Sequence, residues 1–176
     1  MFRIAITLIF SSMLLFSCVT NESKTEVVEE TISISDINKL EAELFNVNNA
    51  TPDMAKAKKL AELYIEYAEL YPNDTNSPEF LFKASDISMN VHSPRLTISL
   101  FDKILTTYPN YENVPTIMFL KGFVYEDQLN DYVNAEKYYT EFLDKFPDSD
   151  FADDAIVSLN NLGKSPEQLI KEFENK

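Results

Sequence analysis

Apolar residues recur at spacings of three and four along most of this chain, the period of a helix with one buried face. The pattern is clearest in three segments, which run from Tyr64 to Pro72, from Phe101 to Pro109 and from Tyr139 to Pro147. Each ends in an aromatic residue followed by proline, and proline excludes the residue before it from the α conformation. These prolines lie 37 and then 38 residues apart. A repeat of this size predicts stacked helical hairpins.

The other five prolines stand where helices are expected to begin, because proline is well suited to the first helical turn. A hydroxyl that can cap the helix precedes four of them, in Thr51, Ser77, Ser93 and Ser165. Ser165 is also followed by Gln168, which completes the pattern of a capping box. Together with the apolar periodicity, these ends predict an all-α fold with helices over 36–48, 52–71, 78–91, 94–108, 115–129, 131–146, 150–162 and 166–175.

The N-terminal segment has a different pattern. Arg3 precedes an apolar run over residues 4–16, which is shorter than the roughly 20 residues needed to span a bilayer. Its length and its basic flank are typical of a secretory signal. The run ends at Leu15-Phe16-Ser17-Cys18, which resembles the lipoprotein box of bacteria. The resemblance implies that residues 1–17 are removed, that Cys18 is lipid-modified and that Val19 directs the protein to the outer membrane.

Residues 18–35 are expected to form a disordered tether. They contain no aromatic residue and consist mostly of Thr, Ser, Glu and Val, so they cannot bury enough apolar surface to offset the entropy of ordering. Residues 36–176 would then form the folded domain. Lipid chains on Cys18 would hold that domain close to the membrane through the tether.

The composition removes several classes of function. The formal net charge of −14 opposes binding to nucleic acid. Only two glycines are present, which argues against glycine-rich phosphate loops. Cys18 is the only cysteine, so no disulfide framework is possible within the chain. We expect no cofactor and no metal.

The third repeat resembles the tetratricopeptide repeat (TPR) at Gly122, Tyr125, Ala135, Tyr139 and Pro147. The run from Phe142 to Ala155 is similar to repeats in the TPR lipoprotein of the outer-membrane β-barrel assembly machinery and in the periplasmic coordinator of the Tol-Pal system. The resemblance covers residues 36–162. It implies a solenoid of about three helical hairpins with a C-terminal capping helix, although the assembly lipoprotein has about five repeats.

In that family the first helix of each hairpin lines a groove for partner proteins. Mapping the repeats through Ala84 and Gly122 places six residues in this groove: Leu81, Ser85, Met89, Phe119, Phe123 and Glu126. Aromatic side chains in such a groove are typical anchors for a peptide or helix. Packing of Phe119 and Phe123 in the core is an equally good interpretation. The resemblance implies an adaptor between envelope proteins on the periplasmic side of the outer membrane.

Candidate catalytic residues are few. His92 is the only histidine, and it stands beside Ser93-Pro94 at an expected helix junction. The acids Asp148, Asp150, Asp153 and Asp154 lack the spacing of a calcium loop and suit a helix N-terminus instead. We therefore expect no enzymatic activity. The alternative is a surface carrier lipoprotein that binds a small molecule or glycan in a closed aromatic pocket.

Overall fold

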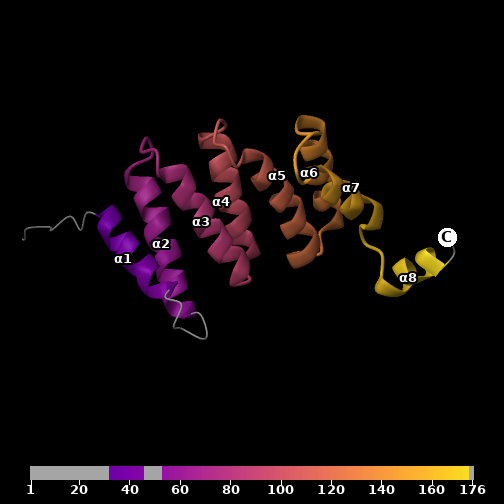
Figure 1. The fold of residues 1–176 in the computed structure, drawn as a ribbon, viewed down its shortest axis with the longest axis horizontal. Helices are drawn as coiled ribbons and strands as arrows, with labels where there is room; N and C mark the ends of the chain where they lie inside the picture. The colour runs from indigo at the N-terminus through magenta and orange to yellow at the C-terminus, as the bar shows by residue number, and fades with distance from the viewer. Residues whose placement is uncertain (1–31, 46–52, 175–176) are drawn as a thin grey trace, which may run out of the picture. The chain divides into compact units, whose positions relative to one another are not determined.

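The computed structural model describes residues 32–45 and 53–174. Within these ranges every regular element is a helix and no strand occurs, so the expected all-α class is confirmed. Figure 1 shows the helices following one another in chain order. They are α1 (Ile34–Leu44), α2 (Met54–Leu70), α3 (Ser77–Asn90), α4 (Pro94–Thr107), α5 (Val114–Phe123), the π-helix η1 (Val124–Gln128), α6 (Tyr132–Lys145), α7 (Ala152–Asn161) and α8 (Pro166–Glu174).

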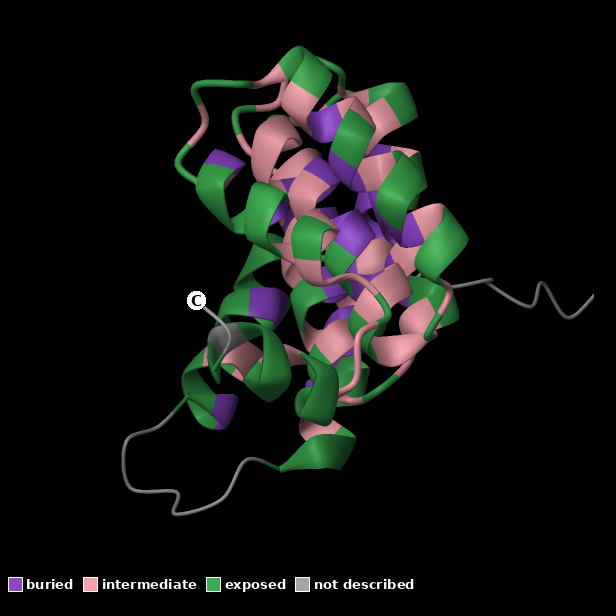
Figure 2. Cartoon of the chain, turned by 90° about the vertical axis from the view of Figure 1, so that its right-hand side faces the viewer, coloured by how far each residue is buried: buried purple, intermediate pink, exposed green. Residues whose placement is uncertain are grey.

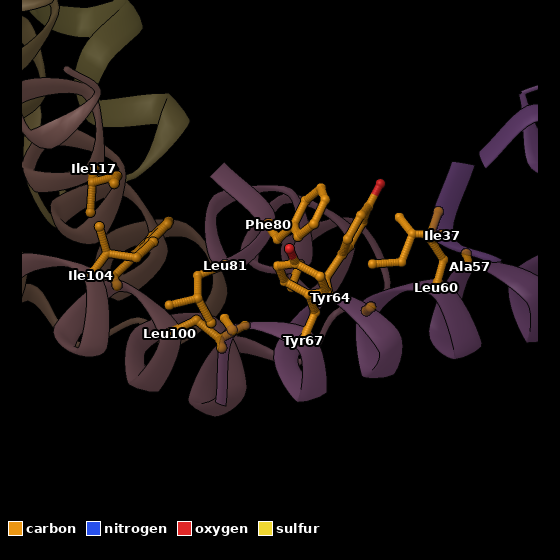
Figure 3. Close-up of a cluster of buried hydrophobic side chains, with 14 of the residues drawn as sticks. Ile37, Ala57, Leu60, Tyr64, Tyr67, Phe80, Leu81, Leu100, Ile104 and Ile117 are labelled. Carbon is orange, nitrogen blue, oxygen red and sulfur yellow. The ribbon is translucent and has the colours of Figure 1, made fainter. Parts of the chain in front are cut away.

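From α1 to α7, each helix packs against the next one along the chain. Their apolar faces form a buried row that includes Ile37, Leu60, Phe80, Ile104 and Ile117, all at most 5% exposed (Figure 3). Full burial of one such side chain contributes about 1.5–3 kcal/mol. A second buried cluster joins α5, α6 and α7. Figure 2 shows buried residues on the inner faces of the helices and exposed ones on the outside.

The loops after α2, α4 and α6 have the same backbone geometry. Each begins with an aromatic residue, and the φ and ψ angles are −126° and 59° at Tyr71, −126° and 59° at Tyr108, and −135° and 56° at Phe146. In each loop the aromatic carbonyl accepts a hydrogen bond from the amide three residues later, at 3.0 or 3.1 Å. A second bond of the same span follows directly. The repeat that the prolines mark in the sequence is therefore also a repeat of structure.

The turns inside the second and third hairpins also correspond. His92 follows α3 and Asn130 follows η1, and both have left-handed backbones, with φ of 54° and 51°. The amide of His92 donates to Met89 and the amide of Ser93 donates to Ser88, which is the Schellman arrangement. His92 is exposed, as expected for a residue at a helix junction.

The extra residue of the longer repeat lies in η1. In α3 the amide of Val91 donates to the carbonyl of Ile87, four residues earlier. At the corresponding place the amide of Leu129 donates to Val124, five residues earlier, at 3.1 Å. A π-turn holds one more residue than an α-turn. The 37- and 38-residue spacings therefore differ because one residue is added inside this helix, and not because a loop is longer.

Several helix starts differ from the sequence prediction. Helix α1 begins at Ile34 and not at residue 36, since Ser33 forms a capping box with Asp36. Asp53 caps α2 through Ala55 and Lys56, whereas the expected cap, Thr51, lies outside the described residues. Helix α3 is preceded by Asn76, and the Ser77 hydroxyl donates to the Tyr71 carbonyl instead.

The two remaining predicted caps differ in outcome. Ser93 precedes α4 but makes no side-chain capping bond, so its predicted role as a hydroxyl cap is wrong. The capping box of α8 is confirmed, because the Ser165 hydroxyl accepts from the Gln168 amide and Gln168 Oε1 accepts from the Ser165 amide.

One helix end also differs from the prediction. Helix α1 ends at Leu44 and not at residue 48.

Candidate partner-binding surface

The groove predicted along the second hairpin is wrong at two of its three residues. Leu81 and Ser85 are both 0% exposed, so neither has surface for a partner to contact. The Ser85 hydroxyl donates to the Phe82 carbonyl at 2.6 Å. Met89 is half-buried and packs against the main core. These residues form the inner face of α3.

The error has a physical cause, which is the position of the π-turn. The prediction aligned Ala84 with Gly122, a spacing of 38 that places the extra residue before Gly122. The loops and hydrogen bonds place it after Tyr125, so the spacing up to that point is 37. Gly122 therefore corresponds to Ser85. The residues of α3 that correspond to Phe119 and Phe123 are Phe82 and Asp86, one position after those predicted.

The predicted residues of the third hairpin lie in three different environments. Phe119 packs against the second core cluster and stacks on Phe151, with ring centroids 4.9 Å apart at 11°. Glu126 accepts a hydrogen bond from the Tyr139 hydroxyl at 2.8 Å. Phe123 is 36% exposed. Of these three residues, Phe123 has the most surface available to a partner.

A different surface, which sequence reasoning missed, lies between α1, the start of α2 and α3. It consists of two hollows of about 380 and 400 Å³. Both are lined by Phe45, Asp86 and Ile87, so they adjoin along α3. Phe45 is 68% exposed at the end of α1. We call the two hollows together the Phe45 groove, whose other lining residues are Glu41, Leu44, Met54, Ala57, Tyr64, Glu79, Phe82, Lys83, Asn90 and Val91.

A hydrogen-bond network fixes one wall of this groove. Glu41 accepts from the Tyr64 hydroxyl and, at 2.9 Å, from the Lys83 ammonium, so it links α1 to α2 and α3. Burial opposes the charge on Glu41, but these hydrogen bonds and the charge of Lys83 outweigh it and lower the pKa of Glu41. Burial, together with the bond to Glu41, raises the pKa of Tyr64. At neutral pH the wall therefore holds an ionised carboxylate and a neutral phenol.

Lys121 is a second residue that the sequence did not single out. It is 4% exposed in α5, forms an ion pair with Asp102 of α4 and lies 3.9 Å from the centre of the Tyr138 ring. Burial alone would lower the pKa of Lys121, but the hydrogen bonds to Asp102 and Tyr138 raise it. Its position corresponds to Ala84 at the 37-residue spacing. Lys121 joins two hairpins and has little surface for a ligand.

The acidic residues near α7 do not form a metal site. Asp153 and Asp154 lie in the first turn of α7, where the helix dipole favours negative charge. Asp148 and Asp150 line an open hollow of about 530 Å³ beside Phe146 and Lys145. Within residues 32–45 and 53–174, no cluster of His, Cys, Asp and Glu side chains is arranged to hold a metal ion.

Two predictions about the N-terminal segment fall outside these ranges. Cys18, its lipidation and residues 18–31 of the predicted tether are not among the described residues. The tether was predicted to extend to residue 35, which is wrong at its end, because Ser33 caps α1 and Ile34 and Ser35 are helical. Among the helices that the structure does describe, none is both long enough and apolar enough to cross a bilayer.

No protein-family model matches the sequence, and no curated protein matches it.

Proposed function

We propose that this chain is a lipid-anchored adaptor, built from TPR-like helical hairpins, that binds other envelope proteins. It would act at the periplasmic side of the bacterial outer membrane, in envelope or outer-membrane protein assembly. Its affinity would come from apolar side chains in a groove, and confinement at the membrane would raise its effective concentration. The proposal includes no chemical reaction.

The observation that carries this proposal is the repetition of the hairpins. Three aromatic-proline loops have closely similar dihedral angles and the same pattern of hydrogen bonds, and two hairpin turns each contain a left-handed residue. Repeated hairpins present neighbouring first helices on one face, and such faces commonly bind proteins. The lipoprotein-like sequence before Cys18 supports attachment to a membrane.

The membrane part of the proposal is tested by metabolic labelling. The full chain is expressed in a Gram-negative bacterium that is fed an alkyne fatty acid, alongside a Cys18→Ser variant as the matched control. We expect label in the wild type and in the membrane fraction, and none in the variant. Equal labelling of both proteins would contradict lipidation at Cys18.

The adaptor part is tested by cross-linking in intact cells followed by purification from detergent. We expect envelope proteins to be retained by the wild-type chain at stoichiometric levels. A chain that is labelled and folded but retains no envelope protein would contradict the adaptor function, even if it is lipid-anchored.

A further inference from the structure

The Phe45 groove has the apolar surface that a docking site needs. Phe45 is 68% exposed and Met54 is 48% exposed, and they lie at the rim of the same hollow. Phe82 and Ile87 are half-buried in the opposite wall, on α3. Single exposed apolar residues are common on any protein. Phe45 and Met54 lie together beside two adjoining hollows, which is the kind of apolar surface that binding partners use.

The charges of the groove favour a basic occupant. Among the residues that line it, Glu41, Glu79 and Asp86 are acidic and Lys83 is the one basic residue. Lys83 is paired with Glu41 at 2.9 Å, and Glu79 accepts from the Tyr111 hydroxyl. Asp86 is exposed, and its carboxylate is contacted by the amide of Asn90 at 3.3 Å. The groove thus has an excess of negative charge, with a solvent-accessible carboxylate beside its apolar surface.

We propose that the Phe45 groove binds a basic segment of a partner protein, in which a Lys or Arg stands next to large apolar side chains. The apolar side chains would fill the two hollows on either side of Phe45, and the cation would pair with Asp86. This proposal rests on the adaptor function and gives the chemistry of the partner. A second copy of this chain suits the groove poorly, because a net charge of −14 makes two copies repel each other.

The walls of the groove are already fixed without a partner. Glu41, Tyr64 and Lys83 connect three helices by hydrogen bonds, and Lys83 lies 5.7 Å from the centre of the Tyr64 ring. A site that is ordered before binding loses less conformational entropy when the partner docks. Binding should therefore depend on the exposed groove residues and change little when surface elsewhere is altered.

The test is a selection of short random peptides, displayed on phage, against the full-length lipidated chain in detergent. We expect enrichment of peptides that combine Lys or Arg with Leu, Phe or Trp, and we expect their affinity to fall as salt is raised. Enrichment of acidic peptides, or of none, would overturn the proposal. Enrichment of apolar peptides whose affinity does not change with salt concentration would also overturn the proposal.

Two groove variants and two matched controls locate the site. Phe45→Ala and Asp86→Lys should each weaken the selected peptides about tenfold or more. The controls alter exposed residues on other helices, Val133→Ala on α6 and Asp153→Lys on α7, and should change affinity less than about twofold. Wild-type affinity in Asp86→Lys would overturn the charge pairing, and wild-type affinity in Phe45→Ala would overturn the site.

The same variants separate this inference from the adaptor function. Envelope proteins that cross-link to the wild type and equally to Phe45→Ala and Asp86→Lys would remove the groove proposal and leave the adaptor function in place. Loss of the cross-linked protein in both groove variants, with retention in both controls, would support the two proposals together. Absence of any cross-linked protein on the wild type would count against the adaptor function itself.

Discussion

The hairpin of α3 and α4 and the hairpin of α5, η1 and α6 have the same ends and different interiors. Each begins after an aromatic-proline loop of the same backbone geometry, and each turns at a residue with a left-handed backbone. In the first, the buried Ser88 and Thr97 hydroxyls meet at 2.6 Å. In the second, Gly122 lies against the Tyr139 ring and a π-turn holds one more residue. The comparison shows that a helix can absorb an inserted residue while its loops keep their geometry.

The largest effect is expected from removing the central aromatic residue of each hairpin. Phe101 and Tyr139 lie 38 residues apart and are both 0% exposed. Phe101→Ala and Tyr139→Ala should each lower the free energy of unfolding by about 3–5 kcal/mol, because each leaves a large cavity. Urea unfolding measures both. If one variant costs less than about 1 kcal/mol, the two hairpins do not share a core position.

Deletion of one residue tests whether η1 contains an insertion. Asp127 is exposed in η1, and its deletion should convert the π-turn to an α-turn at a cost below about 1 kcal/mol. Asp86, exposed in α3, provides the matched deletion. Its removal rotates the following residues by about 100° and should cost about 2–3 kcal/mol. Thermal unfolding followed by circular dichroism compares them, and equal losses would contradict the assignment of the insertion.

A smaller effect is expected at the close contact between α5 and α6. A Cβ atom on Gly122 would lie 2.6 Å from Cδ1 of Tyr139 and 2.7 Å from its Cε1. Gly122→Ala should therefore cost about 1–2 kcal/mol even though alanine is the better helix former. At the corresponding position, Ser85→Ala should cost less than about 1 kcal/mol. A smaller cost of Gly122→Ala in a Tyr139→Leu background than in the wild type would confirm that the ring is the obstacle.

The smallest effect concerns how α4 and α6 begin. Hydrogen bonds from the side chain and the backbone amide of Asn134 lower the pKa of Asp131. A carboxyl whose pKa is lower in the folded chain stabilises it fully above its unfolded pKa, about 3.9. That contribution is lost as the pH falls through the folded-state value.

The matched position in α4 lacks this dependence on pH. Ser93 makes no capping bond, so Ser93→Ala should change stability little at any pH. Asp131→Ala should destabilise the chain near neutral pH, and the difference from wild type should shrink in acid. Unfolding curves recorded from pH 7 down to about pH 3 measure this. A constant difference across that range would contradict the role of the charged cap.

The sequence predicted the helices closely where prolines mark their ends. The expected ranges 94–108 and 115–129 correspond to Pro94–Thr107 and to Val114–Gln128 of α5 and η1. Caps were predicted less well, because Asp53 caps α2 and no side chain caps α3, where Ser77 was expected to do so. These choices depend on local backbone angles, which residue type alone does not determine.

The candidate surface was harder to predict than the fold. A shift of one residue moves a helical position by about 100°, enough to exchange an exposed residue for a buried one. Pro72 and Pro109 lie 37 residues apart. Applying that spacing to Phe119 and Phe123 gives Phe82 and Asp86 instead of Leu81 and Ser85. The position of the π-turn could not be predicted, because no residue type marks it. The Phe45 groove also depends on contacts between α1 and α3, which lie far apart in the chain.

The shared geometry of the aromatic-proline loops has a consequence for how such a chain can change in length. Tyr71 and Tyr108 have identical backbone angles, and the hydroxyl of Tyr108 donates to the carbonyl of Pro72, so one loop rests on the other. A recombination event between the two loops would remove or duplicate one whole hairpin and leave a junction that already exists in the protein. Shorter and longer versions of this chain are therefore accessible in a single genetic step, without a new turn having to evolve.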